Sequence, residues 1–446
     1  MKRVKRRTYS ILTLVLAACV FLTIFLFRLV ANGGTWATHH VNPGSQAVGS
    51  IYDRNGISLV SAEDRGGLVF NENAAIRRAN LHVVGDRQGR IATGMLVAHA
   101  DDLVGYHFIT GTYSLGGGGN TIQATVDAEL NRVADQALGG RHGAVLVMNY
   151  ETGEILVNVS GPTFDPANPP TISNDDPAFD GVFLNRNLSS AFVPGSIFKV
   201  VTAAAAMDTF ADAMTREYVC SGSIVVDGNR VTCTGNHGRI SMERAMGVSC
   251  NPFFAELALD LGGPLLRQYT DRAGLLRAHT VDGIRTRPGN FTAADSGSVA
   301  LAWSGVGQSE NLVNPLGMVR FMGAIARDGT PVEPRLIAHV SGGFFPSGNR
   351  TETGTAVLPS GVAHQLRTLL RNTGTNYYSG TFPGLAVAGK TGTAEVYDGR
   401  PHAWFAGFLD DPHNPLAFVV FVENGGGGLA VAGSVANTVL QAAVQS

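Results

Sequence analysis

The chain has few charged residues and few cysteines for its length. Only 15% of its 446 residues are charged, and 33 Lys and Arg nearly balance 35 Asp and Glu. The sequence therefore lacks the basic field that nucleic-acid binding requires. Four cysteines are too few for a scaffold built on disulfides, and 44% hydrophobic residues exclude a disordered polar chain. The composition predicts large buried cores and no nucleic-acid partner.

The first thirty residues differ from the rest. Five cations lie between Lys2 and Arg7, and an almost uninterrupted apolar run follows from Ile11 to Ala31. As a helix this run is about 30 Å long, enough to cross a bilayer core, and the preceding cations favour the cytoplasmic side. We therefore expect a cytoplasmic tail at residues 1–10, a single-pass signal anchor at residues 11–31 in the plasma membrane, and an extracytoplasmic remainder. A cleaved signal peptide and a lipoprotein site at Leu16–Cys19 are the alternatives.

The chain after the anchor divides into two parts. Residues 32–139 have short apolar runs and an Asn55-Gly56 pair between two apolar segments, which predicts a hairpin in a small β-rich domain. Residues 140–446 hold segments of strand length near both ends and an apolar helical segment at 198–207. We expect one large α/β domain there, whose sheet joins its two ends.

The first chemical motif is Ser196 with Lys199, at the start of the apolar helix. Residues three apart share a helix face, so the amine of Lys199 can lie beside the hydroxyl of Ser196. Burial disfavours the ammonium form of a lysine, which makes Lys199 a candidate base for a serine nucleophile. The structural alternative is an N-cap serine followed by a lysine whose charged end reaches solvent.

Two further motifs follow the first. Ser249-Cys250-Asn251 precedes an apolar helical segment, and each of its polar residues also suits an ordinary helix cap. Lys390-Thr391-Gly392-Thr393 follows an apolar segment; strand alternation places Lys390 and Gly392 on one face, where a glycine permits close approach to the backbone. Its structural alternative is a turn that contains glycine. The order and spacing of the three motifs behind an anchor are more specific than any one of them.

Together the motifs resemble the S-x-x-K, S-x-N and K-T-G elements of the serine penicillin-binding protein and β-lactamase superfamily. Residues 50–56 resemble the pedestal motif of class B (monofunctional) penicillin-binding proteins, and segments at 143–156, 185–188, 305–308 and 314–329 resemble parts of their transpeptidase domain. Within this class, the chain resembles the shorter, penicillin-binding protein A-like members. The resemblance implies a pedestal or dimerisation-like domain at 32–139 and an α/β (α+β) transpeptidase fold at 140–446, with a mainly antiparallel sheet flanked by helices.

The resemblance also implies a mechanism and roles for individual residues. Ser196 would attack the D-Ala-D-Ala bond of a peptidoglycan stem peptide, Lys199 would take its proton, and β-lactams would acylate the same serine. Ser249 and Asn251 would relay a proton and orient the substrate. Lys390, Thr391 and Thr393, beside Gly392, would hold the substrate carboxylate, and the N–H groups of Ser196 and Thr393 would form the oxyanion hole.

Several functions and partners share these residues. A D,D-transpeptidase is the leading hypothesis; a D,D-carboxypeptidase and a non-catalytic β-lactam-binding sensor or divisome scaffold are the alternatives. The expected partners are stem peptides of glycan derived from lipid II, β-lactams, the membrane, and a glycosyltransferase of the SEDS or another type. A class A synthase and a class A β-lactamase are poor fits because the chain shows neither a glycosyltransferase signature nor a deacylating glutamate motif.

The cysteines leave one question open. Cys220 and Cys233 could form a disulfide, stay free thiols, or contribute to a metal site if four ligands converged. No second Cys or His pair lies at ligand spacing in the sequence, so we expect no metal and no cofactor. Cys250 is expected to be a small packing residue.

Overall fold

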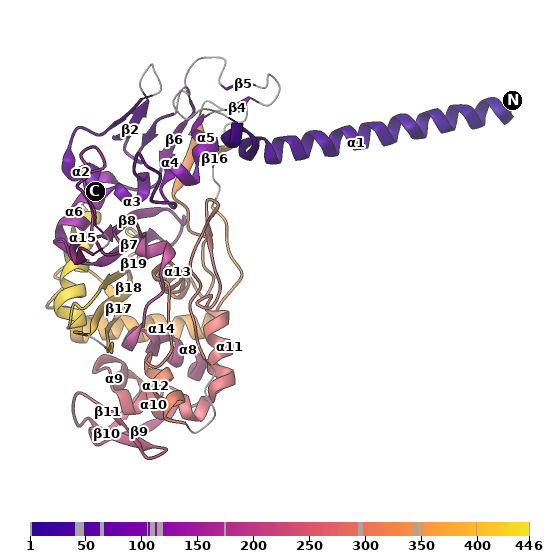
Figure 1. The fold of residues 1–446 in the computed structure, drawn as a ribbon. Coiled ribbons are helices and arrows are strands. Elements are labelled where there is room, and N and C mark those ends of the chain that lie inside the picture. The colour runs from indigo at the N-terminus through magenta and orange to yellow at the C-terminus, as the bar shows by residue number, and fades with distance from the viewer. Residues whose placement is uncertain are drawn as a thin grey trace.

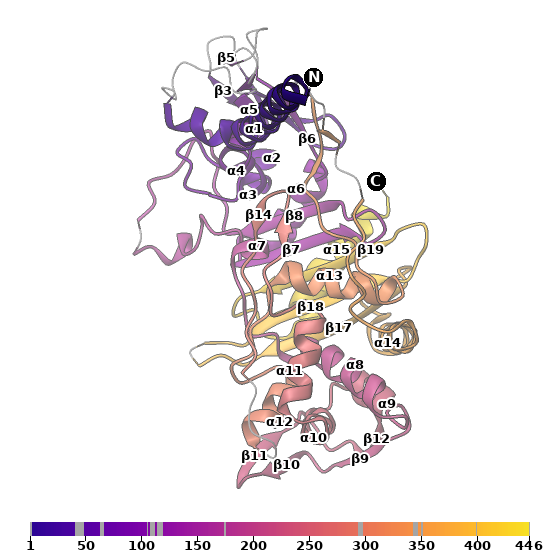
Figure 2. The same cartoon turned by 90° about the vertical axis from the view of Figure 1, so that its right-hand side faces the viewer.

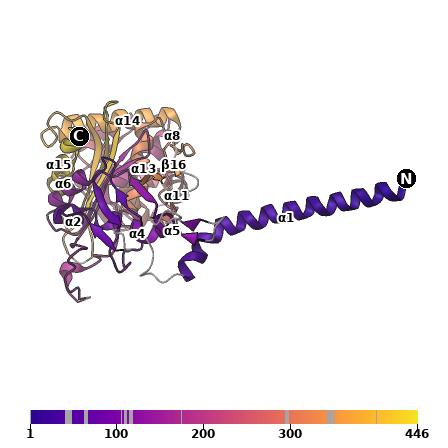
Figure 3. The ribbon, with the colours of Figure 1, turned by 90° about the horizontal axis from the view of Figure 1, so that it is seen from above.

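The structure is a computed structural model. It describes residues 2–40, 49–62, 67–104, 106–107, 112–113, 119–173, 175–292, 298–341, 347–348, 351–397 and 399–445. Helix α1 (Lys2–His40) projects from the body of the protein as a single long rod (Figures 1 and 3). Its segment Lys5–Phe27 is long and apolar enough to cross a membrane, and its side chains are exposed. This helix is consistent with the anchor predicted at residues 11–31. Residues 2–10 of the predicted tail form the first turns of the same helix.

A six-stranded sheet forms the part of the body nearest α1, in the strand order β16-β15-β6-β1-β2-β3. Strands β1 (Ile51–Tyr52) and β2 (Ser58–Ala62) pair antiparallel around Gly56, whose φ of 83° suits a glycine turn. The predicted hairpin is therefore confirmed. The other elements of this part are β3 (Leu68–Phe70), α2 (Ala74–Ala79), α3 (Leu81–Val84), α4 (Met95–Ala98), α5 (Ala100–Val104), β4 (Tyr106–His107), β5 (Thr112–Tyr113) and β6 (Thr121–Ala124).

Two segments cross the predicted domain boundary at residue 140. Strands β15 (Ile337–Ser341) and β16 (Ser347–Gly348) come from the larger part of the chain but extend the six-stranded sheet, where β15 pairs with β6. Helix α6 (Ala128–Leu138) precedes residue 140 but packs against the larger part, because its buried Leu130 and Leu138 share a core with the sheet of that part. The two parts are thus joined by exchanged elements as well as by the chain.

The larger part is built on a five-stranded, wholly antiparallel sheet in the order β17-β18-β19-β7-β8. Its strands are β7 (Gly143–Asn149), β8 (Ile155–Gly161), β17 (Val387–Ala394), β18 (His402–Leu409) and β19 (Leu416–Val422). Because β19 pairs with β7, the sheet joins both ends of the domain, as predicted.

Both faces of this sheet are covered by helices. Along β19 the side chains alternate between two cores: Phe418 and Val420 pack toward α6 and α15 (Ser434–Ala443), whereas Val419 and Phe421 face the core that contains α13 (Pro315–Ala326). Figure 2 shows α13 crossing the face opposite α15. Every residue of β19 is buried, which explains its continuous apolar sequence. The predicted fold class, an antiparallel sheet flanked by helices, is confirmed.

A helical lobe lies at the end of the molecule farthest from α1 (Figures 1 and 2). Its centre is α8 (Lys199–Thr209), preceded by the 3-10 turn η2 (Gly195–Phe198). Every residue of α8 from Lys199 to Met207 is buried, as the all-round apolar sequence predicts. Around it lie α9 (Met242–Gly247), α10 (Asn251–Leu261), α11 (Gly263–Arg272), α12 (Val299–Val306), α14 (Ser360–Thr373) and the strands β9 (Glu217–Cys220), β10 (Ser223–Val226), β11 (Asn229–Thr232) and β12 (Gly238–Ser241).

Short elements complete the chain: η1 (Pro177–Phe179), α7 (Arg186–Ser189), β13 (Thr280–Val281), β14 (Ile284–Arg285), and the π-helical η3 (Gly374–Tyr378) and η4 (Gly428–Gly433). The chain closes with η4, which is followed directly by α15.

Candidate active site

Ser196 lies on a tight turn between the sheet and the buried helix α8. Pro194 precedes the turn, Gly195 adopts a φ of 55°, and its N–H donates to Gly307 O at 2.8 Å. The backbone N–H of Lys199 donates to Ser196 O, which closes a 3-10 turn. Side chains three residues apart are eclipsed in such a turn, so Ser196 and Lys199 share one face, as predicted.

Two close approaches fix this turn. A Cβ on Gly195 would lie 2.6 Å from Thr393 O on β17, and a Cβ on Gly307 would lie 2.0 Å from Gly195 O. The indole Nε1 of Trp404 donates to Val193 O at 2.9 Å, just before the turn. The turn that contains Ser196 is therefore held between the edge of the sheet and the end of α12.

Lys199 is fully buried and has three hydrogen-bond partners. Its Nζ donates to Ser249 O at 2.7 Å, to Asn251 Oδ1 at 2.7 Å and to Ser249 Oγ at 3.1 Å. The amine also lies 5.6 Å from the centre of the Phe254 ring. Burial lowers the pKa of Lys199 to about 7, so a large fraction of the amine is neutral near neutral pH.

The second motif turns its polar groups toward this amine. Ser249 has a φ of 55°, in the left-handed region that a non-glycine residue seldom adopts. Ser249 lies between α9 and α10. Lys199 Nζ contacts the carbonyl and the hydroxyl of Ser249 and the side chain of Asn251. Asn251 Nδ2 also donates to Thr232 O at 2.9 Å, which connects the motif to the end of β11.

The third motif lies on β17, the edge strand of the five-stranded sheet. Lys390 is fully buried, and its Nζ donates to Thr391 O at 3.1 Å. Burial, and then the charge of Lys199, hold the pKa of Lys390 well below its usual value. Gly392 is needed for packing, since a Cβ there would lie 2.9 Å from Pro194 O.

The two threonines of this strand are held by neighbouring groups. Thr391 Oγ1 lies 3.2 Å from the hydroxyl of Tyr378, and Thr393 Oγ1 accepts from Gly428 N at 3.4 Å. Both threonines line the cleft described next. The strand therefore presents two fixed hydroxyl groups beside the turn that contains Ser196.

A cleft of about 330 Å³ brings the three motifs together. Its lining residues are Ser196, Thr232, Cys233, Thr234, Ser249, Asn251, Trp303, Val306, Gln308, Thr391, Thr393 and Glu395. Lys199 and Lys390 are buried behind this lining. A larger hollow of about 860 Å³ is lined by other residues, among them Arg141, Arg400 and Glu423, and the motif residues lie outside it.

The family described as "Penicillin binding protein transpeptidase domain" matches residues 143–441 of the chain. The chain belongs to this family. The match covers the whole five-stranded sheet and all three motifs.

Two curated relatives of this penicillin-binding protein extend the comparison. The chain is 28% identical over 379 residues to the peptidoglycan D,D-transpeptidase PbpA of Mycobacterium tuberculosis, covering 76% of this chain and 74% of the relative. It is 31% identical over 341 residues to stage V sporulation protein D of Bacillus subtilis, covering 71% of this chain and 51% of the relative.

Solved structures share the fold of this penicillin-binding protein. Penicillin-binding protein A of M. tuberculosis, solved as an imipenem acyl-enzyme complex, has a TM-score of 0.79 at 24% identity and covers 91% of this chain and 100% of its own. PBP2 of Pseudomonas aeruginosa has a TM-score of 0.74 at 22% identity and covers 89% of this chain and 96% of its own. These matches include most of the region before residue 143 as well.

Some lining residues were not among the candidates from the sequence. Thr232 is an exposed residue at the end of β11 and Thr234 lies in the exposed loop after it, and Trp303 and Glu395 have no local signal that distinguishes them from ordinary residues. Gln308 ends the segment at residues 305–308 that resembles the family, but the resemblance assigns no role to it. Only the fold brings these side chains to the cleft.

The cysteines correct one inference from the sequence. Cys220 and Cys233 are free thiols in the structure. We expected no metal because no second Cys or His pair lies at ligand spacing in the sequence, but spacing along the chain does not show which ligands the fold brings together. The fold brings His237 and Cys250 to the same point, and the four ligand atoms lie within 4.8 Å of one another. Cys250 is buried, as a packing residue would be, but its sulfur belongs to this group.

Proposed function

We propose that this penicillin-binding protein is a membrane-anchored peptidoglycan D,D-transpeptidase that works through an acyl-enzyme on Ser196. The observation that carries the proposal is the buried Lys199, which shares a turn with Ser196 and is hydrogen-bonded to Ser249 and Asn251. A base with a pKa of about 7 next to a serine in a cleft is the arrangement that acyl transfer by serine requires. The names of curated relatives, including PbpA, support the same activity.

Acylation begins with the neutral amine of Lys199. Its lone pair takes the proton of the Ser196 hydroxyl while Oγ attacks the carbonyl carbon between the two terminal D-Ala residues of a stem peptide. The N–H groups of Ser196 and Thr393 stabilise the oxyanion. Ser196 is near the start of a helical segment, where N–H groups have no intrahelical acceptor. The C–N bond then breaks, and the leaving amine takes a proton relayed through Ser249, which leaves an ester on Ser196.

The β17 strand binds the end of the donor peptide. Thr391 and Thr393 contribute hydroxyl groups to the cleft. Burial lowers the pKa of Lys390 behind them, and the approach of the terminal carboxylate raises it again, so Lys390 gains a proton and positive charge as the peptide binds. Gly392 keeps the strand close to the turn that contains Ser196. A β-lactam presents a similar carboxylate and carbonyl, so it acylates Ser196 by the same route.

The second half-reaction releases the ester. The amine of a neighbouring stem peptide attacks the acyl carbon, its proton passes to Lys199 or Ser249, and the Ser196 oxygen leaves and regains a proton. The product is a peptide cross-link.

The anchor determines the location and the orientation of the enzyme in the membrane. Helix α1 crosses the plasma membrane once, the cations at its start stay in the cytoplasm, and the rest of the chain is extracytoplasmic. Residues 32–139 act as a pedestal for the transpeptidase domain at residues 140–446. Glycan made from lipid II by a glycosyltransferase of the SEDS or another type supplies the stem peptides.

Labelling with a fluorescent penicillin tests the nucleophile. Wild-type full-length protein is expected to form a covalent adduct, and Ser196→Ala is expected to form none while its melting temperature stays close to that of the wild type. Ser434→Ala, which removes an exposed hydroxyl on α15, is the matched control and should label normally. Equal labelling of Ser196→Ala would remove Ser196 from this role.

A reconstitution with lipid II and a glycosyltransferase separates the reactions that share this site. Penicillin-sensitive cross-links are the expected product. Release of D-Ala without cross-links would instead identify a D,D-carboxypeptidase. Neither product from folded protein that still binds penicillin would identify a sensor or scaffold.

A further inference from the structure

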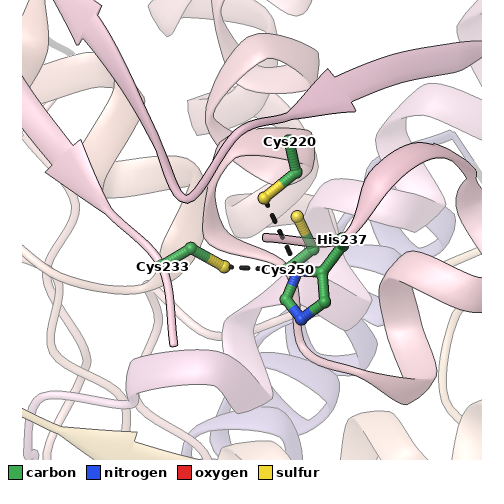
Figure 4. Close-up of side chains that lie close together, drawn as sticks. All are labelled: Cys220, Cys233, His237 and Cys250. Carbon is green, nitrogen blue, oxygen red and sulfur yellow. Dashed lines mark hydrogen bonds between the residues drawn. The ribbon is translucent and has the colours of Figure 1, made fainter. Parts of the chain in front are cut away.

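Three cysteines and one histidine meet beside the cleft (Figure 4). They come from four places in the helical lobe: Cys220 ends β9, Cys233 follows β11, His237 precedes β12, and Cys250 precedes α10. Cys220 and Cys250 are buried, and Cys233 and His237 are half-buried. Their side chains point toward one another in the close-up view.

The separations fit a tetrahedral zinc centre. With Zn–S bonds of about 2.3 Å and a Zn–N bond of about 2.0 Å, a sulfur and a nitrogen lie about 3.5 Å apart and two sulfurs about 3.8 Å apart. His237 Nδ1 is 3.5 Å from Cys220 Sγ and 3.6 Å from Cys233 Sγ. All four ligand atoms, including Cys250 Sγ, lie within 4.8 Å of one another, so small side-chain shifts are enough to coordinate one ion.

We propose that Cys220, Cys233, His237 and Cys250 bind one Zn²⁺ as a structural site. Three soft thiolates with one imidazole are a ligand set that favours zinc over hard cations such as Mg²⁺ or Ca²⁺. Because four protein ligands fill the tetrahedron, no position is left for water or substrate, and the ion takes no part in the acyl transfer itself.

The ion would join the second motif to the wall of the cleft. Cys250 lies between Ser249 and Asn251, which hold Lys199. Cys233 lies between Thr232 and Thr234, which line the cleft, and Thr232 O accepts from Asn251 Nδ2. A metal bound to both cysteines therefore fixes the distance between these two segments. This consequence rests on the proposed function, whereas zinc binding itself does not.

A disulfide is the competing state of these thiols. Outside the cytoplasm any two of the three cysteines could be oxidised, which would leave a third thiol and the imidazole unable to complete a four-ligand site. The two states differ in metal content and in mass, so they can be separated without an activity assay.

The decisive measurement is the zinc content of the full-length protein, purified in detergent without chelator or reductant. We expect about one zinc per chain by elemental analysis, and an X-ray absorption spectrum with a shell of three sulfurs and one nitrogen at tetrahedral distances. Cys233→Ser and His237→Ala should each lose most of this zinc. Cys19→Ser, which removes the exposed thiol of α1, is the matched control and should retain it.

Two results would overturn the site: protein that binds no zinc even after incubation with zinc chloride, or mass spectrometry that finds a disulfide between any two of the three cysteines. Where a variant does not fold, the wild-type metal content and absorption spectrum decide alone. Ser196→Ala is expected to keep its zinc and lose penicillin labelling, so a failure of the metal site and a failure of the proposed function give different results.

Discussion

The two walls of the cleft are built in different ways. The sheet wall, residues 390–393, belongs to a five-stranded sheet with buried cores on both faces. In the opposite wall, which we call the hairpin wall, residues 232–234 follow the two-stranded pair β10–β11, and residues 249–251, between α9 and α10, contact them through Asn251 and Thr232. The pair β9–β12 lies in the same lobe. In these pairs even apolar side chains are exposed, Val219 by 54% and Val225 by 63%.

This difference shows what each wall needs to stay in place. A sheet with helices on both faces positions its residues through backbone hydrogen bonds and buried area, and close glycine contacts add the last constraint. A two-stranded hairpin is marginally stable in water by itself. The hairpin wall therefore depends on cross-links: the hydrogen bonds of Asn251 and Lys199, and the proposed zinc.

The largest expected effect comes from Lys199, which both walls surround. Lys199→Met should slow acylation by penicillin by about 10²–10⁴, because general-base catalysis contributes that much. In the wild type the acylation rate should rise with pH through a midpoint near 7 and level off above it, since burial lowers the pKa of Lys199 to about 7 and only the neutral amine accepts a proton. Stopped-flow measurements of acylation at pH values around neutrality give both the loss of rate in the variant and the midpoint of the wild-type profile.

Lys199→Arg is the control for charge. It keeps a cation in the pocket but cannot lose its proton, so it should be as slow as Lys199→Met. A rate that is independent of pH in the wild type would mean that Lys199 is not the base.

The next largest effect is expected from a change in the hairpin wall that alters the pKa of Lys199. Asn251→Asp places a carboxylate where Oδ1 now lies, 2.7 Å from Lys199 Nζ. An opposite charge this close favours the ammonium, so the pKa of Lys199 should rise and the midpoint of the rate profile should move up by about one to three pH units. The pH profile of acylation is the measurement.

Asn251→Ala separates this electrostatic effect from lost contacts. It removes both hydrogen bonds of the side chain without adding charge, so it should lower the plateau rate and leave the midpoint near 7. Equal midpoints for the two variants would show that the wall positions Lys199 but does not set its pKa.

The sequence predicts the two walls unequally well. Alternation and continuous apolar runs identify β7, β8, β18 and β19, because sheet strands buried on both faces leave a local signal. The hairpin wall leaves little local signal in the sequence, since Thr232 and Thr234 are exposed residues at and just beyond the end of β11. The position of Thr232 is fixed by a contact with Asn251, which is distant in sequence. The proposed metal ligands are only partly evident in the sequence for the same reason: spacing along the chain relates Cys220 to Cys233, but only the fold brings His237 and Cys250 to them.

Hydrogen exchange compares the walls directly. Amides of the β10–β11 hairpin should exchange about 10–100-fold faster than those of β18 and β19, because few buried contacts oppose their local opening. Zinc chelation should speed exchange in residues 229–233 further and leave β19 unchanged. If chelation speeds amide exchange equally in both walls, the hairpin wall does not depend on zinc more than the sheet wall does.

The smallest expected effect on acylation is that of removing one hydrogen bond from β18, the strand next to the sheet wall. Trp404→Phe removes the N–H that donates to Val193 O at 2.9 Å and leaves a small void in a fully buried position. The unpaired carbonyl should cost ~2 kcal/mol of stability, measurable by thermal unfolding. Acylation should slow by less than about tenfold, because the β17–β18 ladder and the Gly307 contact still hold the turn that contains Ser196. Cys233→Ser should cause a greater loss of acylation rate than Trp404→Phe, since it releases the hairpin wall. If Trp404→Phe slows acylation more than Cys233→Ser does, the sheet is the wall that depends on a single contact.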